Sequence, residues 1–196
     1  MGLIAVIALA PALLRRRALA ALMSVRLRLA WLLPAALALH VLVVNVLPGL
    51  PHPIGATVHL ITYGMLAVFL ALNVHLPGLP LVIAGTAANA VTIALNGGVL
   101  PASATALKSA GWNPGTADFT NSAALASPRL AFLGDNYVTP SWVPLGNVFS
   151  IGDVLIALGV LALVVGVTRR QPRHRASLRG RVVTRLVRPA AGSSLS

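Results

Sequence analysis

Residues 151–175 read IGDVLIALGVLALVVGVTRRQPRHR. The first part, Ile151–Val167, is an apolar run of the length that a membrane-spanning helix requires, about 20 residues with about 17 as a minimum. The second part opens a block of arginines that continues to Arg188. Lys and Arg accumulate in cytoplasmic segments next to span ends. This stretch therefore predicts a membrane helix whose carboxyl end lies in the cytoplasm.

A second block of arginines follows another apolar run near the other end of the chain. The two blocks hold 13 of the 15 basic residues: Arg15, Arg16, Arg17, Arg26 and Arg28 in the first, and Arg169, Arg170, Arg173, Arg175, Arg179, Arg181, Arg185 and Arg188 in the second. Residues 29–107 between them contain no Asp, Glu, Lys or Arg. We expect both blocks on the cytoplasmic side of the membrane.

The composition excludes most other classes of protein. With 57% hydrophobic and 9% charged residues and a mean hydropathy of +0.87, the chain has too little polar surface for a soluble domain. The net charge of +12 does not predict nucleic-acid binding, because the basic residues gather at span ends. Anionic lipid headgroups, bound through Arg169–Arg188, are the expected partner. The absence of cysteine excludes disulfides and thiolate chemistry.

The apolar runs predict an all-α bundle of about five membrane spans with the N-terminus outside and the C-terminus inside. The spans cover residues 2–16, 29–47, 56–74, 79–95 and 151–167. The first is short, and it crosses if Arg15 and Arg16 extend their guanidinium groups to the interface. We therefore expect a multi-pass domain over residues 1–168 in the plasma membrane, followed by a basic cytoplasmic tail over residues 169–196.

Several segments outside the spans also have predicted structures. Pro48–Gly55 and Asn73–Pro80 read as tight connections, and residues 18–25 as a helical turn at the interface. Residues 101–149 form an extracytoplasmic loop that holds six of the nine aromatic residues and caps the outer interface. Short helices are expected over 102–110 and 121–133. The tail is either a basic amphipathic helix on the membrane surface or a solvated, disordered segment.

The three carboxylates are Asp118, Asp135 and Asp153, and the chain has no Glu. Asp153 follows Ser150 by three residues, so the pair fits a helix N-cap in which the carboxylate also meets the positive end of the helix dipole. The alternative is that Asp153 faces a polar cavity, where a carboxylate at membrane depth would mark a binding site. The two roles are compatible.

Small and polar residues follow one face of two spans. Gly85, Asn89, Thr92 and Asn96 share a face of the fourth span, which predicts either hydrogen bonds between helices or the lining of a polar ligand site. In the last span Gly152, Gly159 and Gly166 recur every seven residues, which is typical of a close packing face.

Three motifs in one order resemble an uncharacterised bacterial integral-membrane family that is catalogued only as a domain of unknown function. The motifs are Asn96-Gly97-Gly98-Val99-Leu100-Pro101, Leu130-Ala131-Phe132-Leu133-Gly134-Asp135 and Asn147-Val148-Phe149-Ser150-Ile151-Gly152-Asp153. Leu100 stands where methionine is common in that pattern. The resemblance covers roughly residues 1–168 and implies the same membrane architecture. It implies no activity.

Three functions remain open on this reading. The first is a small binding or transport module in which Asn89, Asn96, Asp135 and Asp153 form a polar site at the outer face. The second is an accessory subunit that docks a membrane protein partner. The third, ranked last, is an intramembrane enzyme acting on lipid with Asp135 and Asp153 as an acid–base pair. The histidines fit no metal-ligand spacing, and the sequence carries no cofactor or catalytic motif.

Overall fold

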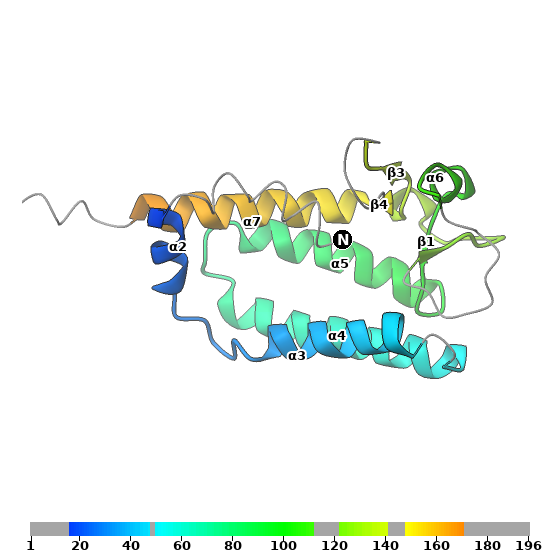
Figure 1. The fold of residues 1–196 in the computed structure, drawn as a ribbon, viewed down its shortest axis with the longest axis horizontal. Coiled ribbons are helices and arrows are strands. Elements are labelled where there is room, and N and C mark those ends of the chain that lie inside the picture. The colour runs from blue at the N-terminus through cyan, green and yellow to red at the C-terminus, as the bar shows by residue number, and fades with distance from the viewer. Residues whose placement is uncertain (1–15, 48–49, 112–121, 141–147, 171–196) are drawn as a thin grey trace, which may run out of the picture.

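The computed structural model describes residues 16–47, 50–111, 122–140 and 148–170. Two pairs of helices lie side by side (Figure 1). One pair is α3 (Leu32–Val41) with α4 (His52–Asn73), and the other is α5 (Leu79–Leu95) with α7 (Ile151–Arg170). The short helix α2 (Arg16–Met23) packs against α7. It corresponds to the helical turn predicted over residues 18–25.

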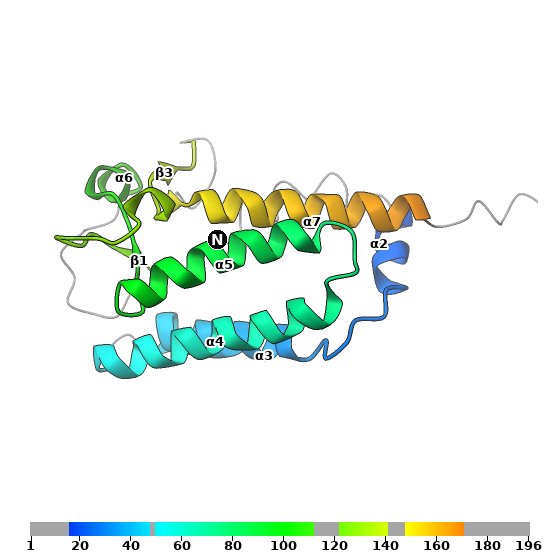
Figure 2. The same cartoon turned by 180° about the vertical axis from the view of Figure 1, so that it is seen from behind.

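Successive helices run in opposite directions, so the connections gather at two ends of the bundle (Figures 1 and 2). The end that carries α2, the α4–α5 connection and the last residues of α7 is called the arginine end, because Arg26, Arg28, Arg169 and Arg170 lie there. The opposite end, which carries all the short strands, is called the loop end. The described members of both arginine blocks therefore lie at one end of the bundle.

Two of the described helices, α4 with 22 residues and α7 with 20, are long and apolar enough to cross a membrane. The shorter apolar helices are α3 and α5, of which α5 has the predicted bounds. Helix α4 begins at His52, four residues before the predicted start, because Pro53 falls in the first helical turn, where proline is tolerated. The predicted span over residues 2–16 and the tail beyond Arg170 lie outside the described residues.

Helix α3 is shorter than the span predicted over residues 29–47. The chain turns before Leu32, with Leu29 at φ +49°, because the backbone of Arg28 is held by hydrogen bonds to the Asn73 side chain. At its other end α3 continues as a single π-helical turn, Leu42–Val46, which closes with a hydrogen bond from Leu47 N–H to Leu42 O. The predicted bounds were therefore too wide at the start.

The loop end contains β-structure that the all-α prediction missed. Strand β1 (Leu100–Pro101) pairs in parallel with β2 (Ser122–Ala123), and β3 (Tyr137–Val138) pairs antiparallel with β4 (Val148–Phe149). The helix predicted over residues 121–133 is wrong. Its first residues pair with β1, and only a 3₁₀ turn, η2 (Ala131–Leu133), remains after Pro128 and the positive φ of Leu130. The helix predicted over 102–110 is confirmed as α6 (Ala104–Ser109), capped by Ser103.

Buried side chains form one cluster within the helices and another under the loops. The first joins α3, α4 and α5 through Leu32, Phe69, Leu70, Leu79 and Val82. The second joins α6 to the strands through Ala102, Ala106, Leu107 and Val148. The strands and α6 therefore pack on their own apolar core at the loop end, which fixes the segment that carries Asp135.

Candidate functional site

Helices α5 and α7 approach closely where Gly85 and Gly152 face each other. A Cβ added to Gly85 would lie 2.3 Å from the carbonyl oxygen of Gly152, and one added to Gly152 would lie 2.0 Å from Asn89 Oδ1. Along α7, Gly159 meets α5 and Gly166 meets the α4–α5 connection at similar distances. The predicted glycine stripe is confirmed as a packing face, and it brings the start of α7 against the Asn89 side chain.

Ser150 and Asp153 cap helix α7 by exchanging hydrogen bonds. Ser150 N–H donates to Asp153 Oδ2 at 2.9 Å, and Asp153 N–H donates to Ser150 Oγ at 3.1 Å. This is a capping box in which aspartate takes the place of the usual Glu or Gln. Asn89 joins the cap to α5, because its amide Nδ2 donates to Asp153 Oδ1 at 2.8 Å and its Oδ1 accepts from Ser150 Oγ at 3.0 Å. The predicted cap is confirmed, and both oxygens of Asp153 are engaged.

The turn after α5 is held against α4 by its two glycines. Gly97 and Gly98 have φ of +71° and +92°, and Gly98 N–H donates back to Ile93 O at 2.9 Å, which is a Schellman helix end. A Cβ on Gly98 would lie 2.3 Å from the Cβ of Ala56 in α4. His59 Nδ1–H of α4 donates to Gly98 O at 2.8 Å. These contacts fix the direction in which the chain enters β1.

Asp135 is held beside β1 by its own backbone. Its N–H donates to Pro101 O at 2.8 Å, and its carbonyl accepts from Ser103 N–H at 3.2 Å. The preceding residue must be small, because a Cβ on Gly134 would lie 2.2 Å from Pro101 O. The Gly134-Asp135 pair therefore lets the chain lie against β1 and turns the carboxyl group inward.

The Asp135 carboxyl group is almost completely buried, with 1% of the residue exposed. Its Oδ2 accepts a hydrogen bond from the Ser122 hydroxyl, whereas its buried Oδ1 has no hydrogen-bond partner among the described residues. Burial raises the pKa of Asp135 from 3.8 to about 6; the Ser122 hydrogen bond lowers it and the charge of Asp153 raises it. Burying a carboxylate oxygen without a donor or a counter-ion costs free energy. Asp135 Oδ1 is therefore the buried unsatisfied atom of the site.

The structure brings two of the four predicted site residues into contact. Asn89 and Asp153 are in direct contact. Asp135 lies at the same end of the bundle, and the negative charge of Asp153 contributes to its raised pKa. Asn96 has a different role. Its side chain donates to Arg129 O and accepts from Arg129 N–H, both at 2.8 Å, and so clasps the loop to the end of α5.

A family model described as "Family of unknown function (DUF5317)" matches residues 24–165. The chain belongs to this family. The match begins after the predicted first span and contains the three motifs quoted above. No curated protein and no solved structure matches the chain. In this member of the DUF5317 family, each motif has a physical role: a helix end that docks on α4, a close approach to β1 that buries Asp135, and a cap that bonds to α5.

Two polar residues were missed in the sequence. Ser122 donates to Asp135, and Tyr63 of α4 lies beside His59, which bonds to the turn after α5. Tyr63 follows His59 by one helical turn, and their rings are in contact with centroids 5.4 Å apart. The polar spacing of His59, Thr62 and Tyr63 in an apolar helix was the available signal. Nothing in the sequence distinguished Ser122 from the other serines of the loop.

Proposed function

We propose that the chain is a multi-pass protein of the bacterial plasma membrane, with five spans, the N-terminus outside and the C-terminus inside. Three observations support this topology. Helices α4 and α7 have the length and apolarity of spans, α3 and α5 lie antiparallel beside them, and the described arginines of both blocks share one end. Large apolar side chains also face outward at mid-helix, as lipid contact requires: Val68, Val91 and Leu158 are each about half exposed.

Reporter fusions test this topology directly. Fusions at Pro51, His75, Thr116 and the C-terminus are expected to read outside, inside, outside and inside, respectively. The fusion at Thr116 is decisive, because it follows α6 at the loop end. A cytoplasmic signal from that fusion contradicts the proposal.

We further propose that the protein is a small binding or transport module whose outer-face site takes a monovalent cation. The observation that carries this proposal is the buried Asp135 Oδ1, which has no donor among the described residues. A single positive charge would balance this carboxylate. A divalent ion is a poor match, because Ca²⁺ and Mg²⁺ sites usually bring several carboxylates or waters, and both oxygens of Asp153 are already engaged in its cap.

The other predicted residues support the Asp135 site instead of forming it alone. Asn89 and Asp153 fix the start of α7 against α5, and Ser122 orients the Asp135 carboxyl group. Asn96 holds the loop that covers this end of the bundle. In this proposal Asp135 contacts the ligand, and the remaining residues form the hydrogen bonds that hold the surrounding structure.

Thermal unfolding of the purified protein in lipid nanodiscs tests the binding proposal. At pH 8 and constant ionic strength, exchanging N-methyl-D-glucamine for Na⁺, K⁺ or methylammonium should raise the melting temperature for at least one of these probes. Asp135→Asn should abolish that rise. Thr57→Ala, an exposed position on α4 whose hydroxyl bonds only to Pro53 O among the described residues, should retain it. The proposal fails if no probe stabilises the wild-type protein, or if Asp135→Asn responds equally.

An accessory subunit is the alternative that one observation favours. Asn89 Oδ1 lies where a Cβ of Gly152 would stand, so this part of the interior is filled by direct contacts between α5 and α7. A subunit needs only such a rigid frame and an exposed face for its partner. Co-purification of a stoichiometric membrane protein, combined with no cation response, would favour this alternative. The intramembrane enzyme ranks last, because both Asp153 oxygens already accept hydrogen bonds that hold the start of α7 in place.

A further inference from the structure

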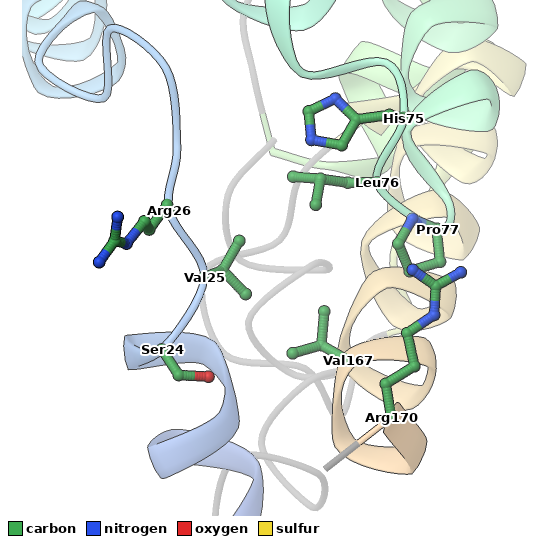
Figure 3. A pocket seen from close by; sticks show the side chains of 8 residues that line it. All are labelled: Ser24, Val25, Arg26, His75, Leu76, Pro77, Val167 and Arg170. Carbon is green, nitrogen blue, oxygen red and sulfur yellow. The ribbon is translucent and has the colours of Figure 1, made fainter.

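A cavity lies at the arginine end, at the opposite end of the bundle from Asp135. It has a volume of about 550 Å³ and is formed by three separate segments: the α2–α3 connection, the α4–α5 connection and the last turn of α7. Val25, Leu76 and Val167 give it an apolar wall (Figure 3). His75 points across the opening (Figure 3). Arg26 and Arg170 lie at opposite margins, and the exposed Arg26 side chain points outward and would have to turn toward the opening to reach a ligand (Figure 3). The cavity is therefore both apolar and cationic.

The positive charge of this cavity is not compensated by the described residues. Neither the Arg26 nor the Arg170 side chain forms a hydrogen bond or an ion pair within the described part of the chain. The two described carboxylates, Asp135 and Asp153, lie at the loop end. Asp153 is separated from Arg170 by about 25 Å along α7, taking 1.5 Å per residue. An anion in the cavity would lower the repulsion between the two guanidinium groups.

Specific hydrogen bonds hold together two of the segments that form the cavity. Asn73, the last residue of α4, accepts a hydrogen bond from Arg28 N–H at 2.9 Å and donates to Arg28 O at 3.0 Å. A further bond to Phe69 O at 2.8 Å fixes the same side chain. This clasp holds the connection that carries Arg26 beside the loop that carries His75. The two connections that carry Arg26 and His75 are therefore held side by side before any ligand arrives.

We propose that this cavity binds the phosphate headgroup of an anionic phospholipid. Guanidinium groups form paired, charge-assisted hydrogen bonds with phosphate oxygens, and His75 supplies a further donor. The apolar wall continues onto α7, along which acyl chains can lie. The location at the ends of long apolar helices matches the depth of the headgroups, so the inference rests on the proposed membrane location but not on the Asp135 site. It is distinct from a general attraction of the basic tail to the membrane surface.

The chain offers matched controls that separate a pocket from general charge. Arg169 and Arg170 are neighbours at the end of α7, and only Arg170 lines the cavity; Arg26 and Arg28 form the same kind of pair in the connection. We would measure phosphatidylglycerol retention by native mass spectrometry of the full chain, after transfer from nanodiscs of phosphatidylcholine with a stepped fraction of phosphatidylglycerol. Arg26→Gln and Arg170→Gln should each lower the retained lipid about tenfold. Arg28→Gln and Arg169→Gln should retain it.

Two outcomes overturn the proposal. Equal losses from Arg169→Gln and Arg170→Gln would mean that only surface charge attracts the lipid. Retention of inorganic phosphate in place of the lipid, at millimolar concentration, would mean that the cavity takes a soluble anion. Melting temperatures in pure phosphatidylcholine should be the same for all four variants, which separates lipid loss from misfolding. Recovery of the wild-type protein without detergent would instead contradict the membrane location itself.

Discussion

Each end of the bundle is held by the hydrogen bonds of one asparagine side chain, but the two ends differ in whether their charged groups are buried or exposed. At the arginine end Asn73 closes α4 and holds the backbone of Arg28; at the loop end Asn96 closes α5 and holds the backbone of Arg129. Beyond these clasps the ends diverge. The loop end buries the Asp135 carboxyl group and engages Asp153 in a helix cap, whereas the arginine end leaves Arg26 and Arg170 around an open cavity. One end therefore holds a buried carboxyl group, and the other carries exposed arginines around an open cavity.

The largest difference between the ends should appear when a methyl group is added to α7. Gly152→Ala places its Cβ on Asn89 Oδ1 and near the backbone of Gly85, so neither neighbour can move aside easily. We expect a loss of about 3 kcal/mol or more in unfolding free energy. Gly166→Ala meets only the Pro77 side chain and should cost less. Reversible unfolding in mixed micelles measures both.

Gly64→Ala is the control for that comparison. Gly64 lies within α4 and nothing is within 4 Å of a Cβ built there, so the substitution should leave stability unchanged or raise it by up to about 1 kcal/mol. If Gly152→Ala is as well tolerated as Gly64→Ala, the close approach of α5 and α7 at the loop end is wrong.

The next largest expected effect is a pH dependence of stability that arises from Asp135 at the loop end. The pKa of Asp135 is raised from 3.8 to about 6 in the folded protein, so the folded state holds this proton more tightly than the unfolded state does. The resulting stability is fully present below pH 3.8 and is lost as the pH rises through about 6. The difference corresponds to about 3 kcal/mol. Melting temperatures should therefore fall between pH 4 and pH 7 in a buffer whose cation is N-methyl-D-glucamine.

Asp135→Asn isolates the contribution of this carboxyl group. The variant should lack the Asp135 component of the pH dependence, and a bound monovalent cation should also weaken that component in the wild-type protein. An unchanged slope in Asp135→Asn would mean that Asp135 does not titrate in this range, and the buried-carboxylate account would fail.

The two asparagine clasps should differ in strength. Asn73 is fully buried and makes three hydrogen bonds, so Asn73→Ala leaves the Arg28 backbone and Phe69 O without partners and should cost about 2 kcal/mol. Asn96 is partly exposed, and water can replace its bonds to Arg129, so Asn96→Ala should cost about 1 kcal/mol. Equal losses would show that the two ends are held equally tightly. Chemical unfolding of both variants in one detergent gives the comparison.

The sequence predicted the long helices α4, α5 and α7 because apolar length is a strong signal, whereas α3 is shorter than predicted and the helix over 121–133 is wrong. The predicted bounds of α5 were correct, and so were the glycine stripe and the Ser150–Asp153 cap, because they depend on local spacing alone. The β-pairs at the loop end were missed because two-residue strands carry no periodicity. The early turn before α3 depends on Asn73, which is 45 residues from Arg28 along the chain.

Part of the candidate site could also be predicted from local spacing along the helices. Asp153 and Asn89 meet because both lie on regular helix faces, so their meeting could be expected from sequence. The burial of Asp135 against Ser122 depends on how an irregular loop pairs with β1. Residue spacing in the sequence does not predict this pairing. Asn96 shares a helix face with Asn89, yet its position at the end of α5 turns it toward the Arg129 backbone.

The central claim is that the two ends face opposite sides of a membrane, and side-specific labelling of single cysteines tests it most directly. The chain contains no cysteine, so Val74→Cys at the arginine end and Ser127→Cys at the loop end, both exposed positions, need no other change. A membrane-impermeant maleimide applied to spheroplasts should label Ser127→Cys in intact cells and Val74→Cys only after permeabilisation. Labelling of both variants in intact cells, or of Val74→Cys alone, would contradict the account.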